Sequence, residues 1–184
     1  MPPWLDQIQP ILIAAVALLT AAITLARLLP HPAKRNVTLA PPDRGLPMTP
    51  PRLTLQHWLF LALGKACPPE VEGAFQCVSL VNFYLRAVRG LPDTTVPRAV
   101  DLSTIKLGGM TWTPNDTTNQ PQEGSVVVWG PDARVGTGSD GHTSICVIAG
   151  QLYLITADQN WSGHQFAEAV GHDYRGILGW HTPT

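Results

Sequence analysis

The sequence has 184 residues, enough for one compact domain with an appendage. Its net charge of −1 divides into five basic and two acidic residues over positions 1–52 (+3) and seven basic and eleven acidic residues beyond (−4). The mildly acidic remainder has no Lys/Arg cluster, which argues against a nucleic-acid partner. Three cysteines (Cys67, Cys77 and Cys146) are too few and too scattered for a disulfide framework, and they form no zinc-knuckle spacing.

The N-terminal segment predicts a membrane anchor. Residues 7–26 carry no charge, and Ile11–Ala26 is almost wholly apolar. At about 1.5 Å per residue, residues 11–29 would span roughly 28 Å, close to one bilayer core. We therefore expect a transmembrane or signal-anchor helix within residues 1–29 that meets the lipid bilayer through residues 8–29. A cleaved signal peptide is disfavoured because a basic n-region and a clear A-x-A site are both missing.

A proline-rich segment follows over residues 30–52, with seven prolines in this stretch. Proline without periodicity predicts an extended polyproline II linker. The basic residues Arg27, Lys34 and Arg35 lie on this side of the apolar run. By the positive-inside rule they favour a cytoplasmic location for the rest of the chain.

Residues 53–184 predict the folded domain. The pattern indicates a helix over Leu53–Ala66 with its N-cap at Thr54, and a second apolar helix from Cys77 to near Gly90. Residues 91–119 contain several breakers and predict short helical pieces and loops. Four later segments read as β-strands: Ser125–Trp129, Thr143–Ala149, Leu152–Ala157 and Ile177–His181. Helices followed by an antiparallel sheet indicate an α+β fold.

Cys77 stands where a glycine-bearing loop becomes a helix. Free N–H groups and the helix dipole at this position favour a thiolate, so Cys77 is a candidate nucleophile. The alternative is a small buried hydrophobic residue, the commoner role of a free cysteine.

A histidine and two polar residues are predicted to meet at one end of a hairpin. His142 begins one predicted strand, and Asp158 and Asn160 follow the end of the next, with Gly150-Gln151 as the tight turn between them. In an antiparallel pair the start of one strand lies beside the end of the other. Alternation would place Asp158 and Asn160 on one face, where they could orient the imidazole as a cysteine–histidine hydrolase requires.

Five short motifs surround these candidates in order: Phe75-Gln76-Cys77, Pro121-x-x-Gly124-Ser125 leading into Val126–Trp129, Gly141-His142 leading into Ile145–Ile148, Asp158-Gln159-Asn160-Trp161, and Gly176–Trp180. Over residues 54–182 this ordered set resembles the CHAP domain, the cysteine, histidine-dependent amidohydrolase/peptidase family of phage lysins and bacterial cell-wall hydrolases. The resemblance implies a papain-like fold with N-terminal helices packed on an antiparallel sheet. The anchor predicted from the apolar run would precede this fold as one transmembrane helix.

Carried over by position, the resemblance implies that Cys77 is the nucleophile and His142 the general base and later acid. Asp158 stands where the family usually has glutamate and would orient His142, with Asn160 as the accompanying amide. Because the Asp158 side chain is one methylene shorter than glutamate, Asn160 is an alternative main orienting partner.

The backbone N–H of Cys77 is expected to help form an oxyanion hole, and Gln76 and Trp161 are candidates for the oxyanion and substrate side of the site. Some family members carry a calcium loop before the nucleophile. Here residues 64–76 hold only Glu70 and Glu72 and no aspartate. We therefore expect no metal and no cofactor.

The implied function is a peptidoglycan hydrolase that cleaves an amide bond of the stem peptide or cross-bridge, either as an N-acetylmuramoyl-L-alanine amidase or as an endopeptidase. As an endolysin or virion-associated lysin, its domain would lie outside the cytoplasm or on a virion, with the phage particle or lysis proteins as partners. The moderately hydrophobic anchor resembles, in composition only, those of signal-arrest-release endolysins. This location conflicts with the positive-inside rule.

Two alternatives stay open. One is a membrane-tethered structural or virion component with a CHAP-like fold, and the other a cytoplasmic amidase acting on small peptides.

The remaining histidines and Cys146 have structural interpretations. His164, His172 and His181 lack metal-ligand spacing and are expected on the surface or in loops. Cys146 shares strand parity with His142 and is expected to be a buried core thiol.

Two tryptophans and one loop lie near the motifs. Trp129 and Trp161 are expected mainly in the core, although Trp161 could also wall a cleft. The loop Gly130–Gly141 is rich in glycine and is expected to admit substrate.

Overall fold

The computed structural model describes residues 52–68, 76–116, 118–132 and 134–184, all within Thr49–Thr184, the second of two units into which the chain divides. The predicted anchor (1–29) and all but the last residue of the predicted linker (30–52) lie outside the described residues. No helix in the described part is long and apolar enough to cross a bilayer.

The first described helix, α2, spans Leu55–Ala62. It begins as predicted, because the Thr54 hydroxyl accepts a hydrogen bond of 3.2 Å from the backbone N–H of His57. It ends four residues earlier than predicted. Leu63 forms an isolated bridge with Ala167, and the Gly64 N–H donates to the Ala167 carbonyl at 2.7 Å. These tertiary bonds draw the chain away from the helix axis.

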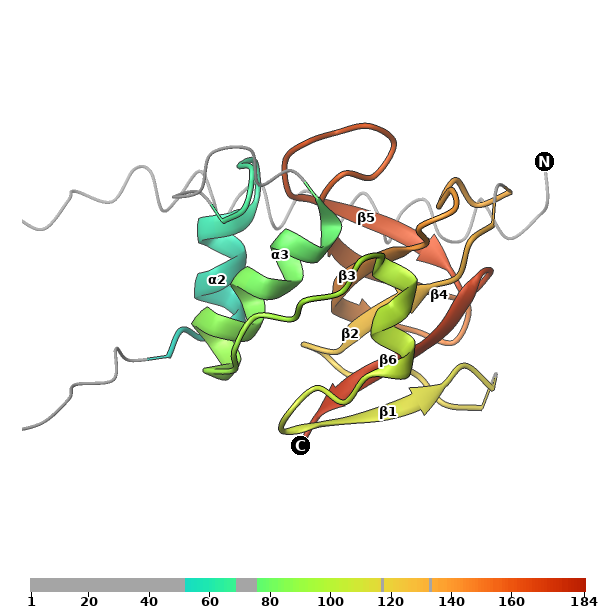
Figure 1. The fold of residues 1–184 in the computed structure, drawn as a ribbon, viewed down its shortest axis with the longest axis horizontal. Coiled ribbons are helices and arrows are strands. Elements are labelled where there is room, and N and C mark those ends of the chain that lie inside the picture. Colours follow the sequence, from blue (N-terminus) through green and yellow to red (C-terminus); the bar gives the residue numbers. More distant parts are fainter. Residues whose placement is uncertain (1–51, 69–75, 117, 133) are drawn as a thin grey trace, which may run out of the picture. The chain divides into compact units, whose positions relative to one another are not determined.

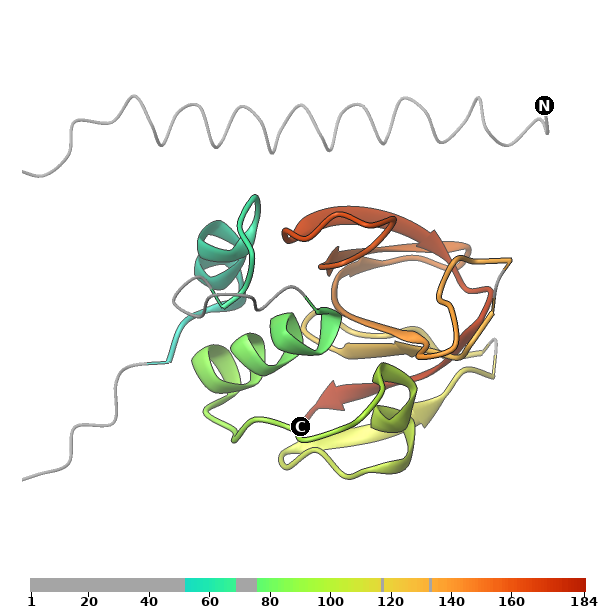
Figure 2. The ribbon, with the colours of Figure 1, turned by 45° about the horizontal axis from the view of Figure 1, so that its top comes forward.

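The second helix, α3, spans Cys77–Tyr84 and continues as a π-helical turn, η1, over Leu85–Arg89. Gly90 ends it in the left-handed region at φ 64°, as the predicted stop requires. The helix buries Leu80, Val81 and Tyr84, and α2 and α3 lie beside each other at one flank of the sheet (Figures 1 and 2). The prediction that Cys77 starts a buried helix is confirmed.

The segment predicted as irregular contains two elements. A 3₁₀ helix, η2, spans Ala99–Thr104, and a strand, β1, spans Met110–Pro114. The prediction of short helical pieces is confirmed, but the strand was not predicted.

Six strands form one sheet in the order β1-β6-β2-β3-β4-β5, with every neighbouring pair antiparallel. The predicted strands correspond to β2 (Val126–Trp129), β3 (His142–Ala149), β4 (Tyr153–Asp158) and β6 (Ile177–Pro183). The second unpredicted strand is β5 (Glu168–Asp173). Both unpredicted strands are sheet edges, and the α+β class is confirmed.

The sheet is buried on both faces, and β2 shows why its sequence is almost continuously apolar. Val126 and Val128 pack in the cluster that holds the helices, whereas Val127 and Trp129 pack in a second cluster on the opposite face. Successive side chains point to opposite faces, so a strand covered on both sides loses the polar alternation of an exposed one. Cys146 is fully buried in the second cluster, as predicted.

Candidate active site

The end of the β3–β4 hairpin brings His142 and Asp158 together. His142 is the first residue of β3 and Asp158 the last of β4, and the two strands pair with Ile145 opposite Ala157. Nε2 of His142 donates to Oδ1 of Asp158 at 2.6 Å. The two side chains therefore lie together, as expected from the hairpin. Both are buried: His142 is 4% exposed and Asp158 0%.

The backbone just before His142 explains the glycine there. Gly141 has φ +70°, and a Cβ at this position would lie 2.4 Å from the carbonyl oxygen of Trp129. Only glycine accommodates both the left-handed conformation and this close approach of two strands. Gly141 therefore sets the point at which His142 enters the sheet.

Cys77 lies near the imidazole of His142. It is the first residue of α3, follows the extended N-cap Gln76, and is 8% exposed. Its side chain interacts with that of His142, and both residues line the same cleft. Sulfur, imidazole and carboxylate thus form a line of neighbouring groups, in the order Cys77, His142, Asp158.

The electrostatics of this line favour a charged imidazole. Burial, the largest influence, lowers the pKa of His142, but hydrogen bonds to Asp158 and Cys77 and the charges of both outweigh it and raise the pKa to about 9. For Asp158, burial acts to raise the pKa, yet hydrogen bonds to His142 and His172 and their charges hold that pKa below its ordinary value. An ionised carboxylate thus holds a protonated imidazole beside the side chain of Cys77.

The second oxygen of Asp158 has two further partners. Oδ2 accepts from the hydroxyl of Thr156 and, at 3.3 Å, from Nε2 of His172. His172 is 8% exposed, so the expectation of a surface or loop position is wrong. It lies in β5, whose sequence EAVGHD gave no strand signal, and only the register Leu154 opposite His172 carries it to this face.

His181 also differs from expectation. It is 1% exposed, lies in β6, and Nε2 forms a 2.8 Å hydrogen bond with the Leu102 carbonyl, away from the site. His164 is exposed, as expected, and pairs with Glu168. Within the part of the chain that the structure describes, His172 is the one of these three histidines that hydrogen-bonds to a candidate site residue, Asp158.

Asn160 does not take the predicted orienting position. Its Nδ2 donates to Oε1 of Gln76 at 3.0 Å, and its backbone N–H donates to the His164 carbonyl at 2.7 Å. Its φ of 61° shows that the chain has turned out of the strand. The expected alternation therefore ends at Asp158, and Asn160 faces Gln76 rather than His142.

Gln159, between Asp158 and Asn160, joins the end of β4 to Cys67 and Gln76. Its Oε1 accepts from the Cys67 N–H at 2.6 Å, and its Nε2 donates to the carbonyls of Cys67 and Gln76, each at 3.0 Å. The side chain is fully buried. These bonds fix the backbone just before Cys77 against the end of β4.

Two tryptophans surround the imidazoles. Ring centroids of His142 lie 5.6 Å from Trp129 and 4.9 Å from Trp161, and those of His172 lie 4.9 Å and 4.6 Å from the same two rings. Trp129 is 1% exposed, as expected of a core residue, whereas Trp161 is only partly buried. The four rings form one aromatic cluster.

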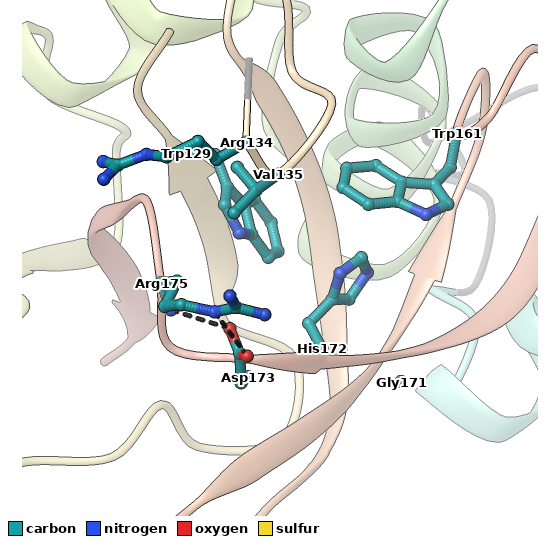
Figure 3. Close-up of a pocket in the computed structure, with 8 residues that line it drawn as sticks. All are labelled: Trp129, Arg134, Val135, Trp161, Gly171, His172, Asp173 and Arg175. Atoms are coloured by element: carbon teal, nitrogen blue, oxygen red, sulfur yellow. Dashed lines mark hydrogen bonds and ion pairs between the residues drawn. The ribbon is translucent and has the colours of Figure 1, made fainter. Parts of the chain in front are cut away.

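A cleft of about 460 Å³ opens over Cys77 and His142. It is lined by Gln76, Cys77, Val78, Val96, Pro97, Arg98, Ala99, Gly136, Thr137, Gly138, Asp140, Gly141, His142, Asn160 and Trp161. Trp161 also lines a second pocket of about 290 Å³, together with Trp129 and His172 (Figure 3). The loop that was expected to admit substrate borders the cleft.

The described residues contain no group of three or more His, Cys, Asp or Glu placed to hold a metal ion. What they do provide is a thiol, an imidazole and a carboxylate as neighbours at the edge of an open cleft. This arrangement is suited to acyl transfer through a thioester.

Comparison with protein-family models gives no match, and comparison with curated proteins gives none either. Solved structures do match. The crystal structure of wild-type endolysin LysIME-EF1 has a TM-score of 0.56 and 22% identity over 69% of this chain and 61% of that one. Ly7917 has a TM-score of 0.48 and 18% identity, over 60% and 54%, both alone and "with the hydrolyzing product of MDP".

The folded unit therefore has an endolysin-type fold. This similarity is one of fold, and this chain spans 61% of the LysIME-EF1 chain.

Proposed function

We propose that this protein is a peptidoglycan hydrolase that cleaves an amide bond by cysteine nucleophilic catalysis, in the manner of the CHAP family. The observation that carries the proposal is that Cys77, at the start of α3, lies beside His142, whose Nε2 donates to Asp158. Its endolysin-type fold supports the choice of substrate.

In the first step, the Cys77 thiolate attacks the carbonyl carbon of the amide and a C–S bond forms. Negative charge then develops on the carbonyl oxygen. The first N–H groups of a helix lack partners within the helix, so the Cys77 N–H can donate to this oxygen. Gln76 lines the cleft, and its Oε1 already accepts from Asn160. Its NH₂ group is therefore the part of the side chain that can donate to substrate.

In the second step, the C–N bond breaks and the His142 imidazolium gives its proton to the leaving amine. Water, deprotonated by the now neutral His142, attacks the thioester and releases the carboxylic acid and the Cys77 thiol. Asp158 stays ionised throughout and holds the Nε2–H of His142, which keeps Nδ1 directed at the reacting atoms. The bond cleaved is that of an N-acetylmuramoyl-L-alanine amidase or of an endopeptidase.

The test is digestion of purified peptidoglycan by the full chain, with mass spectrometry of the released muropeptides. We expect release by wild type and none above background by Cys77→Ala or His142→Gln. The matched control is Cys146→Ala, a buried cysteine outside the site, which should retain activity. The new termini identify the bond cleaved: an amidase separates the stem peptide from the amino sugar, whereas an endopeptidase creates new termini within the peptides. Equal release by wild type and Cys77→Ala, or release by neither when both are folded, would remove the proposal and favour a structural role.

We further propose that residues 1–29 anchor the protein in a bilayer with residues 53–184 on the extracytoplasmic side or on a virion. Peptidoglycan lies outside the cytoplasmic membrane, and the apolar run Ile11–Ala26 supports an anchor. The basic residues after the run favour the opposite orientation. Fusing the C-terminus to alkaline phosphatase and, separately, to a fluorescent protein decides between the two orientations. Phosphatase activity is expected if residues 53–184 lie outside the cytoplasm. Fluorescence without phosphatase activity would favour the cytoplasmic amidase instead.

A further inference from the structure

The carboxylate of Asp158 bridges two buried histidines. Oδ1 accepts from Nε2 of His142 at 2.6 Å, and Oδ2 accepts from Nε2 of His172 at 3.3 Å and from the Thr156 hydroxyl. The mechanism proposed above uses His142 and leaves His172 without a role.

A buried carboxylate needs such partners. Asp158 is fully buried, and an ionised group without hydrogen-bond donors in such a place is strongly disfavoured. The donors on Oδ2 also restrict rotation about the Cβ–Cγ bond, because a rotation would break both bonds. They therefore keep Oδ1 directed at His142. This matters most for an aspartate, whose short side chain has little freedom to recover the contact by other rotamers.

His172 itself is held firmly. It lies in β5 opposite Leu154, and its ring packs against Trp161 at 4.6 Å and Trp129 at 4.9 Å. Figure 3 shows its ring beside those of Trp129 and Trp161 in the second pocket. His172 is not among the residues that line the cleft over Cys77. His172 therefore acts on a substrate in that cleft indirectly, through neighbours such as Asp158, Trp129 and Trp161.

We propose that His172 is a positioning residue: by donating to Oδ2, it holds Asp158 so that Asp158 keeps the imidazole of His142 in place beside Cys77. This inference rests on the proposed function, since it assigns a role in the same catalytic line. A substituted His172 should therefore impair the chemical step and not the binding of substrate.

Two substitutions separate the donor from the ring. His172→Phe keeps an aromatic ring among the tryptophans and removes the donor. His172→Gln removes the ring and places an amide N–H near the original Nε2. The matched control is His181→Phe. His181 is also a buried strand histidine, and its ring centroid lies 4.8 Å from that of Trp112. Each is made in the full chain, and its folding is checked by circular dichroism.

Two readouts are measured on each variant. The first is kcat and KM for a soluble muropeptide, and the second is the rate at which iodoacetamide alkylates Cys77 at about pH 7, where the thiolate is the reacting form. Mass spectrometry assigns the labelled cysteine, and Cys67 and Cys146 are both fully buried. The alkylation rate reports the state of the thiolate without any substrate turnover.

We expect His172→Phe to lower kcat and the Cys77 alkylation rate by about 10- to 100-fold each, the range for losing one hydrogen bond to a charged group, with KM within about twofold of wild type. His172→Gln should restore most of both rates, and His181→Phe should change neither. If His172→Phe does not fold, His172→Met provides the donor-free variant.

The proposal is overturned if a folded donor-free variant keeps wild-type kcat and alkylation rate, or if His172→Gln is as impaired as His172→Phe. It is also overturned if KM alone changes. These outcomes are distinct from failure of the proposed function. In that case wild type itself would release no muropeptides, and the alkylation rates would still decide the role of His172.

Discussion

Replacing Asp158 by asparagine tests the electrostatic basis of the site. The substitution keeps the shape and removes the charge that, with its hydrogen bond, raises the pKa of His142 to about 9. Burial then opposes the remaining contribution of Cys77, so we take the ordinary value of 6.5 as the expected upper limit for the variant.

The magnitude follows from the two titration curves. At about pH 8, a group with pKa about 9 is roughly nine-tenths protonated, and one with pKa about 6.5 is only about 3% protonated, a ratio of about 30. At about pH 5.5 both are at least about nine-tenths protonated, so this part of the deficit disappears. Asp158→Asn should therefore lose activity increasingly as the pH rises, by about 30-fold or more at about pH 8.

The assay is kcat/KM for muropeptide release across the pH range, with wild type measured in the same buffers and folding checked at each pH. The alkaline limb of the wild-type profile should lie near the pKa of His142, about 9, and that of the variant at or below about 6.5. A deficit that is the same at every pH would show that Asp158 acts through orientation alone. An alkaline limb that stays near 9 in the variant would refute the reasoning.

Three further predictions concern neighbouring residues. Asn160→Ala should lower kcat by less than about 10-fold, because its amide contacts Gln76 and not the imidazole; a larger loss in the same assay would contradict this. Gly141→Ala should lower the free energy of unfolding by about 2 kcal/mol or more, since a Cβ would meet the Trp129 carbonyl oxygen at 2.4 Å with φ at +70°, and an unchanged urea midpoint would count against it. The pKa of His142 is raised on folding, so its stabilisation is present below about pH 6.5 and is lost as the pH rises through about 9, up to about 3 kcal/mol in all. Urea titrations below about pH 6.5 and above about pH 9 should show this difference in the free energy of unfolding in wild type and not in His142→Gln.

The elements that could be predicted are those whose sequence carries a strong local pattern. β2 and β3 are runs of apolar, β-branched residues bounded by glycine, because both faces of the sheet are covered there. The edge strands carry weaker patterns. β5 buries only His172 and contains Gly171, so neither apolar alternation nor β propensity marks it. The burial of His172 beside Asp158 could not be predicted for the same reason.

Within the site, the hairpin geometry was enough to pair His142 with Asp158, because antiparallel strands bring those ends together. The same rule failed for Asn160, since it assumes that the strand continues, and a left-handed residue breaks the alternation. That Cys77 reaches His142 did not follow from any local pattern. It depends on how α3 packs against the sheet, and only the resemblance of the ordered motifs indicated it.

The buried amide of Gln159 has a consequence for how this protein can vary. It joins Gln76, the residue before Cys77, to the end of β4 across 83 sequence positions. Because this tie is direct, the position of Gln76 relative to the end of β4 does not depend on the intervening surface turns alone. The turn between β3 and β4 (residues 150–152) lies at the hairpin end remote from His142 and Asp158, so it could be exchanged while the tie stays in place.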